Sequence, residues 1–286
     1  MNQALRDAIQ ATAGHPGPIG VFDSGYGGLT VLREIRRALP QADYIYLGDN
    51  ARAPYGNRSF DLVYKFTLEA VEYLFARGCQ LVILACNTAS AKALRTIQQN
   101  DLATLDPSRR VLGVIRPTAE FVGKETQTGH IGLFGTPGTV ASQSYDMELA
   151  KLHPSLSIQS HACPMWVPLV ENLEAEGDGA DYFVRRDIEA LMSADHAIDT
   201  VILGCTHYPL LLNKINKYMP ASVRVLNQGP IVAESLLDYL RRHPEMDRRI
   251  TRGGSVEYVT TEAPDKFATL AAVFMGMPVD AHRVSL

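Results

Sequence analysis

Short apolar runs alternate with longer amphipathic stretches along most of the chain. The amphipathic stretches have the period of a helix, and they cover residues 29–39, 60–76, 89–99 and 140–149. The apolar runs are rich in Val, Ile and Leu, which is typical of short buried strands. We expect these strands at residues 20–22, 44–47, 81–84, 111–115, 131–134 and 201–203. Strands that alternate with helices predict an α/β fold with mainly parallel sheets.

Two segments of the first half recur in the second half. Residues 19–22 (IGVF) recur as residues 131–134 (IGLF), 112 positions later, and residues 81–88 (LVILACNT) recur as residues 200–207 (TVILGCTH), 119 positions later. The two pairs keep the same order at similar offsets, which indicates two related halves. Ligands bind at the carboxyl ends of the strands in open α/β sheets. Two facing halves would therefore enclose a small ligand in the cleft between them.

The extent of the repeat predicts the domain organisation. We expect two pseudo-symmetric α/β domains, the first formed by residues 19–114 together with 227–286 and the second by residues 115–226. The last segment has no counterpart within the repeat, so we expect it to return to the first domain. Residues 1–18 are polar and rich in alanine, and we expect a flexible extension with one helical turn around Leu5 to Ile9.

Composition and charge narrow the class of protein. The chain has 286 residues, of which 46% are hydrophobic and 20% charged, as is ordinary for a globular protein. Its 27 basic and 31 acidic residues give a net charge of −4, so there is no basic excess for binding nucleic acid. No apolar run approaches the ~20 residues of a membrane span, and no signal-peptide core is present. We therefore expect a cytoplasmic protein with a small-molecule partner, and neither nucleic acid nor a membrane as a partner.

The four cysteines are Cys79, Cys86, Cys163 and Cys205. A reducing cytosol disfavours disulfides, and the lack of a Cys-x-x-Cys pair disfavours a zinc ribbon or a thioredoxin motif. His161 lies close to Cys163, but two ligands without a second pair make a weak site, so we expect no metal. We expect Cys79 and Cys163 to be inert core thiols.

Cys86 and Cys205 occupy equivalent positions after their strands. Cys86 precedes Asn87 at the start of a helix, where free N–H groups and the helix dipole are expected to lower the pKa of the thiol. Cys205 is followed two positions later by His207. A cysteine near a histidine can form a thiol hydrolase, although residues two apart need not face each other.

Two thiols on opposite sides of one carbon explain the symmetry better than a hydrolase does. Racemisation needs a base that removes the α-proton and an acid that delivers a proton to the other face, and thiols have a suitable pKa. The neighbouring Asn87, Thr88 and Thr206 could hold the carboxylates of an acidic amino acid. We interpret the chain as a cofactor-independent amino-acid racemase. A thiol hydrolase using Cys205 and His207, and a non-catalytic binder of acidic ligands, stay open as alternatives.

The segment Asp23 to Gly28 (DSGYGG) follows the first strand and opens a helix. It lacks the Gly-x-Gly-x-x-Gly spacing, no Walker lysine follows, and a carboxylate in the turn would repel phosphate. We therefore expect no dinucleotide cofactor. Asp23 suits an amine ligand or a proton relay, and the glycines suit the geometry of the turn.

Six segments together resemble the glutamate racemases of the aspartate/glutamate racemase superfamily. The paired CNTAS and GCTHYPLL motifs are the most specific part of this likeness, which extends from residue 19 to about residue 240. The segments are residues 19–31 (IGVFDSGYGGLTV), 47–56 (LGDNARAPYG), 81–91 (LVILACNTASA), 135–140 (GTPGTV), 167–171 (VPLVE) and 201–211 (VILGCTHYPLL).

The resemblance implies two facing α/β domains with the active site in the cleft, and chemistry without pyridoxal phosphate or metal. It implies that Cys86 is the base for D-glutamate and Cys205 the base for L-glutamate. Asp23 and His207 would assist the two thiols, and Glu171 matches an acidic residue near the second thiol. The implied substrate contacts are Asp23, Ser24, Pro54, Tyr55, Gly56, Asn87, Thr88, Thr136, Thr139, Thr206 and His207.

The resemblance also implies a role and an assembly. The role is the supply of D-glutamate for peptidoglycan, and hence for cell-wall biogenesis and cell shape, and the assembly is a homodimer. A racemase for aspartate or another amino acid stays open, because one methylene is typically worth only ~1–3 kcal/mol of discrimination. The chain departs from the family pattern at Tyr26 (usually Val), at Arg116 (often Glu) and at residues 227–229, where Asn-Gln-Gly replaces Asp-Ser-Gly. These departures concern domain contacts, regulation and substrate preference rather than the two cysteines.

Overall fold

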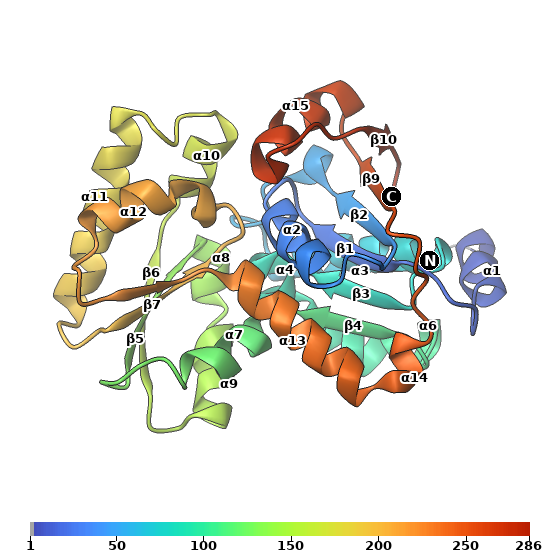
Figure 1. Cartoon of the computed structure of the whole chain (residues 1–286), viewed down its shortest axis with the longest axis horizontal. Coiled ribbons are helices and arrows are strands. Elements are labelled where there is room, and N and C mark those ends of the chain that lie inside the picture. Colours follow the sequence, from blue (N-terminus) through green and yellow to red (C-terminus); the bar gives the residue numbers. More distant parts are fainter. Residues whose placement is uncertain (1–2) are drawn as a thin grey trace.

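The computed structural model describes residues 3–286 and contains two separate parallel sheets (Figure 1). The strand order is β10-β9-β2-β1-β3-β4 in the first sheet and β6-β5-β7-β8 in the second. All strand pairs within these two sheets are parallel. The predicted class, two α/β domains with mainly parallel sheets, is confirmed. We call the first sheet with its flanking helices the first body, and the second sheet with its flanking helices the second body. The domain boundaries at residues 114/115 and 226/227 stay a prediction.

The strands of the first sheet come from both ends of the chain. They are β1 (Ile19–Asp23), β2 (Tyr44–Gly48), β3 (Leu81–Leu84), β4 (Arg110–Gly113), β9 (Val256–Thr260) and β10 (Ala281–Arg283). The second sheet is formed by one continuous stretch of chain. Its strands are β5 (His130–Gly135), β6 (Ser157–Ala162), β7 (Thr200–Gly204) and β8 (Arg224–Leu226).

The predicted apolar runs lie in strands, with one shift at the end of β4. Residues 114 and 115 were expected in this strand, but Ile115 begins the next helix and Val114 is its cap. The sequence did not predict β6, β8, β9 or β10. Three of these, β6, β8 and β10, are edge strands with partly exposed side chains, so they lack the continuous apolar run of a buried strand.

Helices flank both sheets (Figure 1). The first body has α1 (Gln3–Ala11), α2 (Gly28–Ala38), α3 (Phe60–Ala76), α4 (Asn87–Lys92), α5 (Leu94–Thr96), α6 (Leu102–Leu105), α14 (Pro244–Asp247) and α15 (Pro264–Met275). The second body has α7 (Ile115–Val122), α8 (Pro137–Ala141), α9 (Ser144–Leu152), α10 (Trp166–Glu171), α11 (Asp178–Ala194) and α12 (Leu212–Tyr218), and α13 (Gln228–Arg242) follows it. Short non-α turns lie at Asn50–Arg52, Ile97–Asp101 and Tyr208–Leu211.

Two predicted helices match closely and two are interrupted. The expected helices at 29–39 and 60–76 correspond to α2 and α3. The expected helix at 89–99 is divided into α4, α5 and a π-helical turn. The helix expected at 140–149 is divided between α8 and α9, because Gln143 takes a left-handed conformation with φ of 52°.

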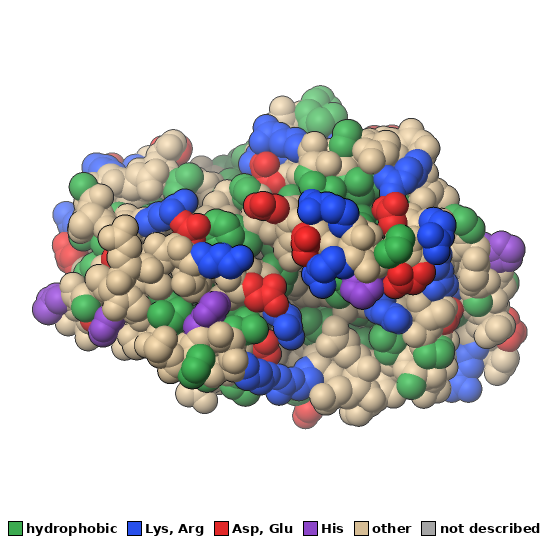
Figure 2. Space-filling view, turned by 60° about the horizontal axis from the view of Figure 1, so that its bottom comes forward, with side chains coloured by type: hydrophobic (Ala, Val, Ile, Leu, Met, Phe, Trp, Pro, Cys, Tyr) green, Lys and Arg blue, Asp and Glu red, His purple; other side chains and the backbone are tan. Residues whose placement is uncertain are grey.

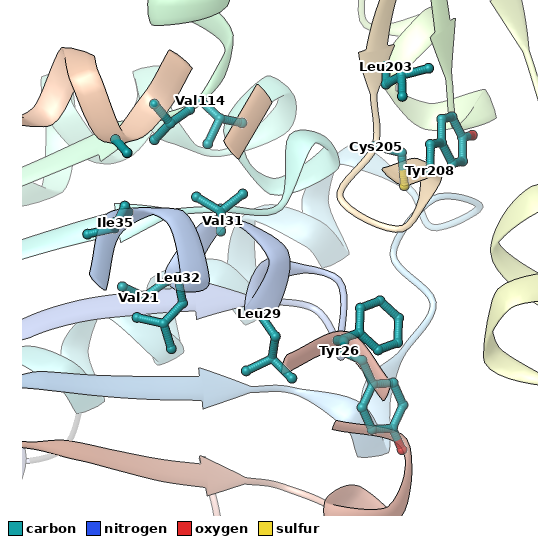
Figure 3. Packing of buried hydrophobic residues seen from close by; sticks show 14 of the residues in the cluster. Val21, Tyr26, Leu29, Val31, Leu32, Ile35, Val114, Leu203, Cys205 and Tyr208 are labelled. Carbon is teal, nitrogen blue, oxygen red and sulfur yellow. The ribbon is translucent and has the colours of Figure 1, made fainter. Parts of the chain in front are cut away.

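The chain passes between the two bodies at two places. It leaves β4 for α7 through Val114, and it leaves β8 for α13 through Asn227. Helix α13 packs along α2 of the first body and also contacts α7 of the second. The largest apolar cluster likewise joins Val21 and Leu29 of the first body to residues such as Tyr208 of the second (Figure 3). The two bodies therefore share a packed interface rather than a bare linker.

The amino-terminal segment differs from the flexible extension that was expected. Residues 3–11 form α1, which packs on α3 and buries Ile9 in the core of the first body. The buried guanidinium of Arg109 donates to Ile9 O at 2.8 Å and to Thr12 Oγ1 at 2.7 Å. The side chain of Gln80 donates to Thr12 O at 3.1 Å. The helical turn expected around Leu5 to Ile9 lies within α1, but these partners lie far along the chain, so local sequence patterns did not predict the full helix or its packing.

Neither the charge on the surface nor the length of the helices is unusual in residues 3–286. On the face shown in Figure 2, acidic and basic side chains are interspersed. Within residues 3–286, no helix combines the length and the apolar character needed to cross a lipid bilayer.

Candidate active site

A cavity of about 90 Å³ lies between the two bodies, lined by the turns that follow β1, β3, β5 and β7. These are the four turns that the sequence repeat predicted at the ligand-binding ends of the strands. Predicted residues in the lining are Ser24, Pro54, Tyr55, Gly56, Cys86, Asn87, Thr88, Thr136, Glu171, Cys205 and Thr206. Asp23, Thr139 and His207 are outside this lining and contact residues that belong to it. The structure thus brings the predicted set together around one small space.

Cys86 lies at the end of β3 and caps the start of α4. Its Sγ accepts a hydrogen bond from Ala89 N at 3.5 Å and lies 3.4 Å from Ser24 Oγ. We expected the start of the helix to lower the pKa of this thiol, and that expectation is wrong. Burial, reinforced by the negative charge of Asp23, raises the pKa of Cys86 to about 12 and outweighs these two hydrogen bonds.

Asp23 is fully buried at the end of β1. Its Oδ1 accepts from Gly25 N at 2.9 Å, and its Oδ2 accepts from Thr206 Oγ1 of the second body at 3.3 Å. Burial raises the pKa of the Asp23 carboxyl, while the charge of His207 opposes that rise. Asp23 therefore acts on Cys86 through its charge, and Ser24 is the residue of this turn whose side chain contacts the thiol.

Cys205 forms a chain of contacts with His207 and Glu171. Cys205 Sγ lies 3.9 Å from His207 Nδ1, and His207 Nε2 lies 2.9 Å from Glu171 Oε1. Burial lowers the pKa of His207, but its hydrogen bonds with Cys205 and Glu171 raise it to about 10. His207 is therefore an imidazolium at neutral pH, and its positive charge lies beside Cys205. The two residues do face each other, although their spacing in the sequence did not require it.

Hydroxyl and backbone groups join the two bodies across the cavity. Thr88 Oγ1 lies 3.0 Å from Thr136 Oγ1 and 3.3 Å from Thr139 Oγ1. Gly138 N donates to Gly56 O at 2.8 Å. Together with the bond from Thr206 to Asp23, these contacts hold the cavity closed. Several predicted substrate contacts thus bind one another in the free protein.

The side chains of Tyr55 and Asn87 are already engaged within the protein. Tyr55 donates its hydroxyl proton to Asp49, which also forms an ion pair with Arg52. Asn87 uses its amide nitrogen and its amide oxygen in hydrogen bonds to other side chains. These residues line the cavity, but they offer a substrate less free hydrogen-bonding capacity than the sequence implied.

One group of residues beside the cavity has the composition of a metal site. His161, Cys163 and Asp187 bring their ligand atoms within 4.8 Å of one another, and Asp187 was not foreseen from the sequence. Asp187 Oδ1, however, accepts from Arg186 at 2.8 Å, and it lies 3.3 Å from His161 Nε2. The Arg186 guanidinium pairs with Oδ1 of this carboxylate, and the absence of a metal stays a prediction. Cys163 was expected to be core, and it also lines the cavity.

Two departures from the family pattern have a structural explanation. Tyr26 stacks on Phe267 and Phe274 of α15, at ring distances of 5.4 and 6.1 Å. Phe274 in turn meets the ring of His207 edge to face at 5.3 Å. Tyr26 therefore helps to hold the carboxyl-terminal helix beside the second thiol. Arg116 pairs with Glu120 at 2.9 Å and lies outside the lining of the cavity.

Comparison with known proteins matches residues 19–236 to the family described as Asp/Glu/Hydantoin racemase. This chain belongs to that family. The glutamate racemase of Ruegeria sp. (strain TM1040) is 40% identical over 269 residues, which cover 90% of this chain and 96% of the relative. A crystal structure of a glutamate racemase isoform from Bacillus anthracis has a TM-score of 0.86 and 36% identity, over 94% of this chain and 98% of that one.

A further structure in the racemase family extends the comparison to a bound ligand. The glutamate racemase of Francisella tularensis, solved in complex with D-glutamate, has a TM-score of 0.83 and 28% identity, and the match covers 94% of this chain and 98% of that one. The resemblance inferred from the paired cysteine motifs is confirmed, as is the enzyme class, a racemase.

Proposed function

We propose that this chain is a cofactor-independent glutamate racemase in which Cys86 and Cys205 act on opposite faces of the α-carbon. The observation that carries the proposal is that two thiols, at equivalent turns of two related bodies, line one cavity. Curated relatives about 40% identical over nine-tenths of the chain are named glutamate racemases. A structural neighbour holds D-glutamate, which supports glutamate as the substrate.

The two thiols have different charged neighbours. The Sγ of Cys205 lies 3.9 Å from Nδ1 of the His207 imidazolium. Cys86 is buried near the carboxyl of Asp23, and its raised pKa keeps it a thiol at neutral pH. A two-base reaction requires one thiolate and one thiol in the same cavity. We propose that Cys205 is the thiolate and Cys86 the thiol in the state that accepts L-glutamate.

The proposed reaction is one proton transfer at each face. In the direction from L-glutamate, the Cys205 thiolate removes the α-proton and Cys86 delivers its proton to the opposite face, which gives D-glutamate. The reverse direction starts from the state with a Cys86 thiolate and a Cys205 thiol. The hand assigned to each thiol rests on the family resemblance. The hydroxyls of Thr88, Thr136 and Thr206 are placed to exchange their mutual hydrogen bonds for bonds to the substrate carboxylates.

The contacts of Cys205, His207 and Glu171 favour one alternative, a thiol hydrolase. The order thiol, imidazole, carboxylate is the order found in hydrolases that use a cysteine nucleophile. That reaction has no use for a second thiol in the equivalent turn of the other body. A two-base racemase explains both thiols, so it is the better reading of the site.

The proposed activity implies a role in building the cell wall. D-glutamate made by this enzyme would serve peptidoglycan synthesis, and through it cell-wall biogenesis and cell shape. The proposed location is the cytoplasm, the proposed assembly is a homodimer, and the proposed partner is L- or D-glutamate. Growth of a D-glutamate auxotroph that carries this gene, in medium without D-glutamate, tests the role.

Circular dichroism of L-glutamate or L-aspartate incubated with the pure protein tests the activity. We expect the signal of L-glutamate to decay to zero and that of L-aspartate to decay far more slowly. The variants Cys86→Ser and Cys205→Ser should each lose activity by roughly 10²–10⁴-fold, the contribution of a positioned acid or base. Cys79→Ser is the matched control, because this thiol is equally buried but lies outside the cavity lining. A thiol hydrolase would leave the circular dichroism of free L-glutamate unchanged.

Racemisation alone cannot assign a hand to each thiol. The two enantiomers have equal free energies, so kcat/KM must be the same in both directions for every variant. A β-chloro analogue of glutamate avoids this constraint, because it eliminates chloride after a single proton abstraction. We expect Cys205→Ser to retain elimination from the D-analogue only, and Cys86→Ser to retain it from the L-analogue only. Equal loss from both analogues in both variants would show that the thiols act as one unit.

A further inference from the structure

Three buried side chains from different parts of the fold form a closed ring of hydrogen bonds beside Cys86. Asn87 Nδ2 donates to Gln228 Oε1 at 2.6 Å, and Gln228 Nε2 donates to the Tyr145 hydroxyl at 2.6 Å. The Tyr145 hydroxyl donates to Asn87 Oδ1 at 2.7 Å and closes the ring. Gln228 Nε2 also donates to Thr118 Oγ1 at 2.9 Å. Each of these four side chains is almost fully buried.

The ring touches both places where the chain passes between the bodies. Gln228 is the first residue of α13, directly after the return crossing. Thr118 donates its own proton to Val114 O at 2.8 Å, and Val114 is the residue of the outward crossing. Tyr145 belongs to α9 of the second body, and Asn87 belongs to the Cys86 turn of the first. One glutamine side chain therefore contacts residues of both bodies at their junction.

The ring also determines which end of the Asn87 amide faces Gln228. Asn87 lines the cavity beside Cys86. An amide that could rotate would present its oxygen to an anionic substrate as readily as its N–H groups, and the oxygen would repel a carboxylate. The reverse orientation of the ring would require Gln228 Oε1 to face Thr118, whose proton is already given to Val114 O. The hydrogen-bond pattern thus favours one orientation.

We propose that Gln228 is a positioning residue for the racemisation reaction: it fixes the Asn87 amide and couples the Cys86 turn to the junction of the two bodies. The proposal rests on the proposed function, because the substrate bound beside Asn87 is taken to carry a carboxylate. Gln228 itself lies outside the cavity lining, so its effect passes through Asn87. Loss of the side chain should weaken substrate binding more than it slows the chemical step.

Gln228→Met tests the proposal, because methionine has a similar length and neither donates nor accepts a strong hydrogen bond. We expect kcat/KM for L-glutamate to fall by roughly 10–100-fold, mainly through a higher KM. A loss of this size is typical when a group near the reacting centre is displaced. Gln80→Met is the matched control. Gln80 is equally buried and hydrogen-bonded, to Thr12 O and Gly78 O at 3.1 Å, but it precedes β3 at the end opposite to Cys86. We expect it to lose thermal stability and to keep kcat/KM within threefold.

Gln228→Glu tests the role through the pH dependence of kcat/KM, which a purely structural role would not change. A protonated carboxyl can donate to Tyr145 and accept from Asn87, as the glutamine does, whereas a carboxylate cannot donate. Burial raises the pKa of a carboxyl, so the protonated form should persist into the accessible pH range. We expect the ratio of kcat/KM between this variant and the wild type to be highest near pH 6 and to fall as the pH rises.

The outcomes separate this proposal from the proposed function. If the wild type racemises glutamate and Gln228→Met retains kcat/KM within threefold, the positioning role is wrong and the racemase stands. A pH-independent ratio for Gln228→Glu, with equal losses in Gln228→Met and Gln80→Met, would also overturn it. If the wild type does not racemise glutamate, the rate of Cys86 alkylation by iodoacetamide replaces the kinetic readout. Gln228→Met should then change that rate at least fivefold relative to the wild type and Gln80→Met, and an unchanged rate would refute the coupling.

Discussion

Replacing Glu171 by Gln should move the basic limb of the pH profile and leave the activity at pH 7 almost unchanged. Glu171 accepts from His207 at 2.9 Å, and this contact helps to keep His207 positively charged beside Cys205. Glutamine can still accept the same hydrogen bond, but it carries no charge. The variant therefore removes the electrostatic part of the contact and retains its geometry.

The size of the shift follows from the surroundings of His207. Burial lowers the pKa of His207, but its hydrogen bonds with Cys205 and Glu171 raise it from 6.5 to about 10. The Glu171 side chain is 26% exposed, so solvent screens its share. A charge-assisted hydrogen bond is worth ~1.5–3 kcal/mol, which corresponds to about 1–2 pKa units. We expect the pKa of His207 to fall to roughly 8–9 in the variant.

The assay is the initial rate of L-glutamate racemisation by circular dichroism between pH 6 and 10.5. The wild type should give a bell-shaped kcat/KM with a basic limb near pH 10, because activity is lost as His207 loses its proton. A shift of about 1.5 units predicts a variant roughly eightfold slower at pH 9.5 and nearly normal at pH 7. Glu174→Gln is the control, since Glu174 is exposed and lies three residues further along the chain. An unshifted limb, or an equal loss at all pH values, would refute the role given to Glu171.

Three further predictions concern other parts of the molecule. Gly27→Ala would place a Cβ 2.1 Å from Thr206 Oγ1 and 2.4 Å from His207 Nδ1, so it should displace the second thiol turn and lower kcat/KM by roughly 10²-fold, measured by circular dichroism. Arg109→Met removes a buried guanidinium that binds α1, and the free energy of unfolding in urea should fall by roughly 3–5 kcal/mol with little change in kcat/KM. Activity should survive dialysis against a chelator and treatment with hydroxylamine, which would remove a metal and a pyridoxal aldehyde respectively.

Each of these predictions has a contrary result. Normal activity in Gly27→Ala would mean that the two bodies separate enough to admit a methyl group without effect on the site. An unchanged unfolding free energy for Arg109→Met would mean that α1 adds nothing to stability. Activity lost to the chelator or to hydroxylamine, and restored by the metal or by pyridoxal phosphate, would contradict a mechanism based on thiols alone.

The sequence predicted the parts of the fold that repeat a simple pattern. Continuous apolar runs identified β1, β2, β3, β5 and β7, because strands buried on both faces must be apolar along their whole length. The edge strand β6 (SIQSHA) has partly exposed side chains and carries no such signal. Helix α1 depends on Arg109, about 100 positions away, and no local pattern can report such a partner.

The residues of the site were predicted from the sequence, but the pKa of one of its thiols was not. The repeat placed Cys86 and Cys205 at equivalent turns, and both line the cavity. The sequence predicted a lowered pKa for Cys86, but the pKa is raised. Burial and the charge of Asp23 depend on tertiary packing, and they outweigh the effect of the helix start. Gln228 and Tyr145 were not predicted as neighbours of Asn87, because their contacts join three elements that are distant in the sequence.

The order of strands in the first sheet has a consequence for how this protein is made in the cell. Strand β2 is an interior strand only because β9 pairs with it, and the partner of Tyr44 is Val256, 212 positions later. A ribosome adds roughly 5–20 residues per second, so the edge of β2 remains unpaired for roughly 10–40 s of synthesis. Its sequence, YIYLG, is apolar and uncharged, and such an open edge pairs readily with strands of other chains. The second sheet, which uses residues 130–226, is complete before that edge is covered. The yield of folded protein therefore depends on how well the nascent β2 edge is shielded until β9 (Val256–Thr260) emerges.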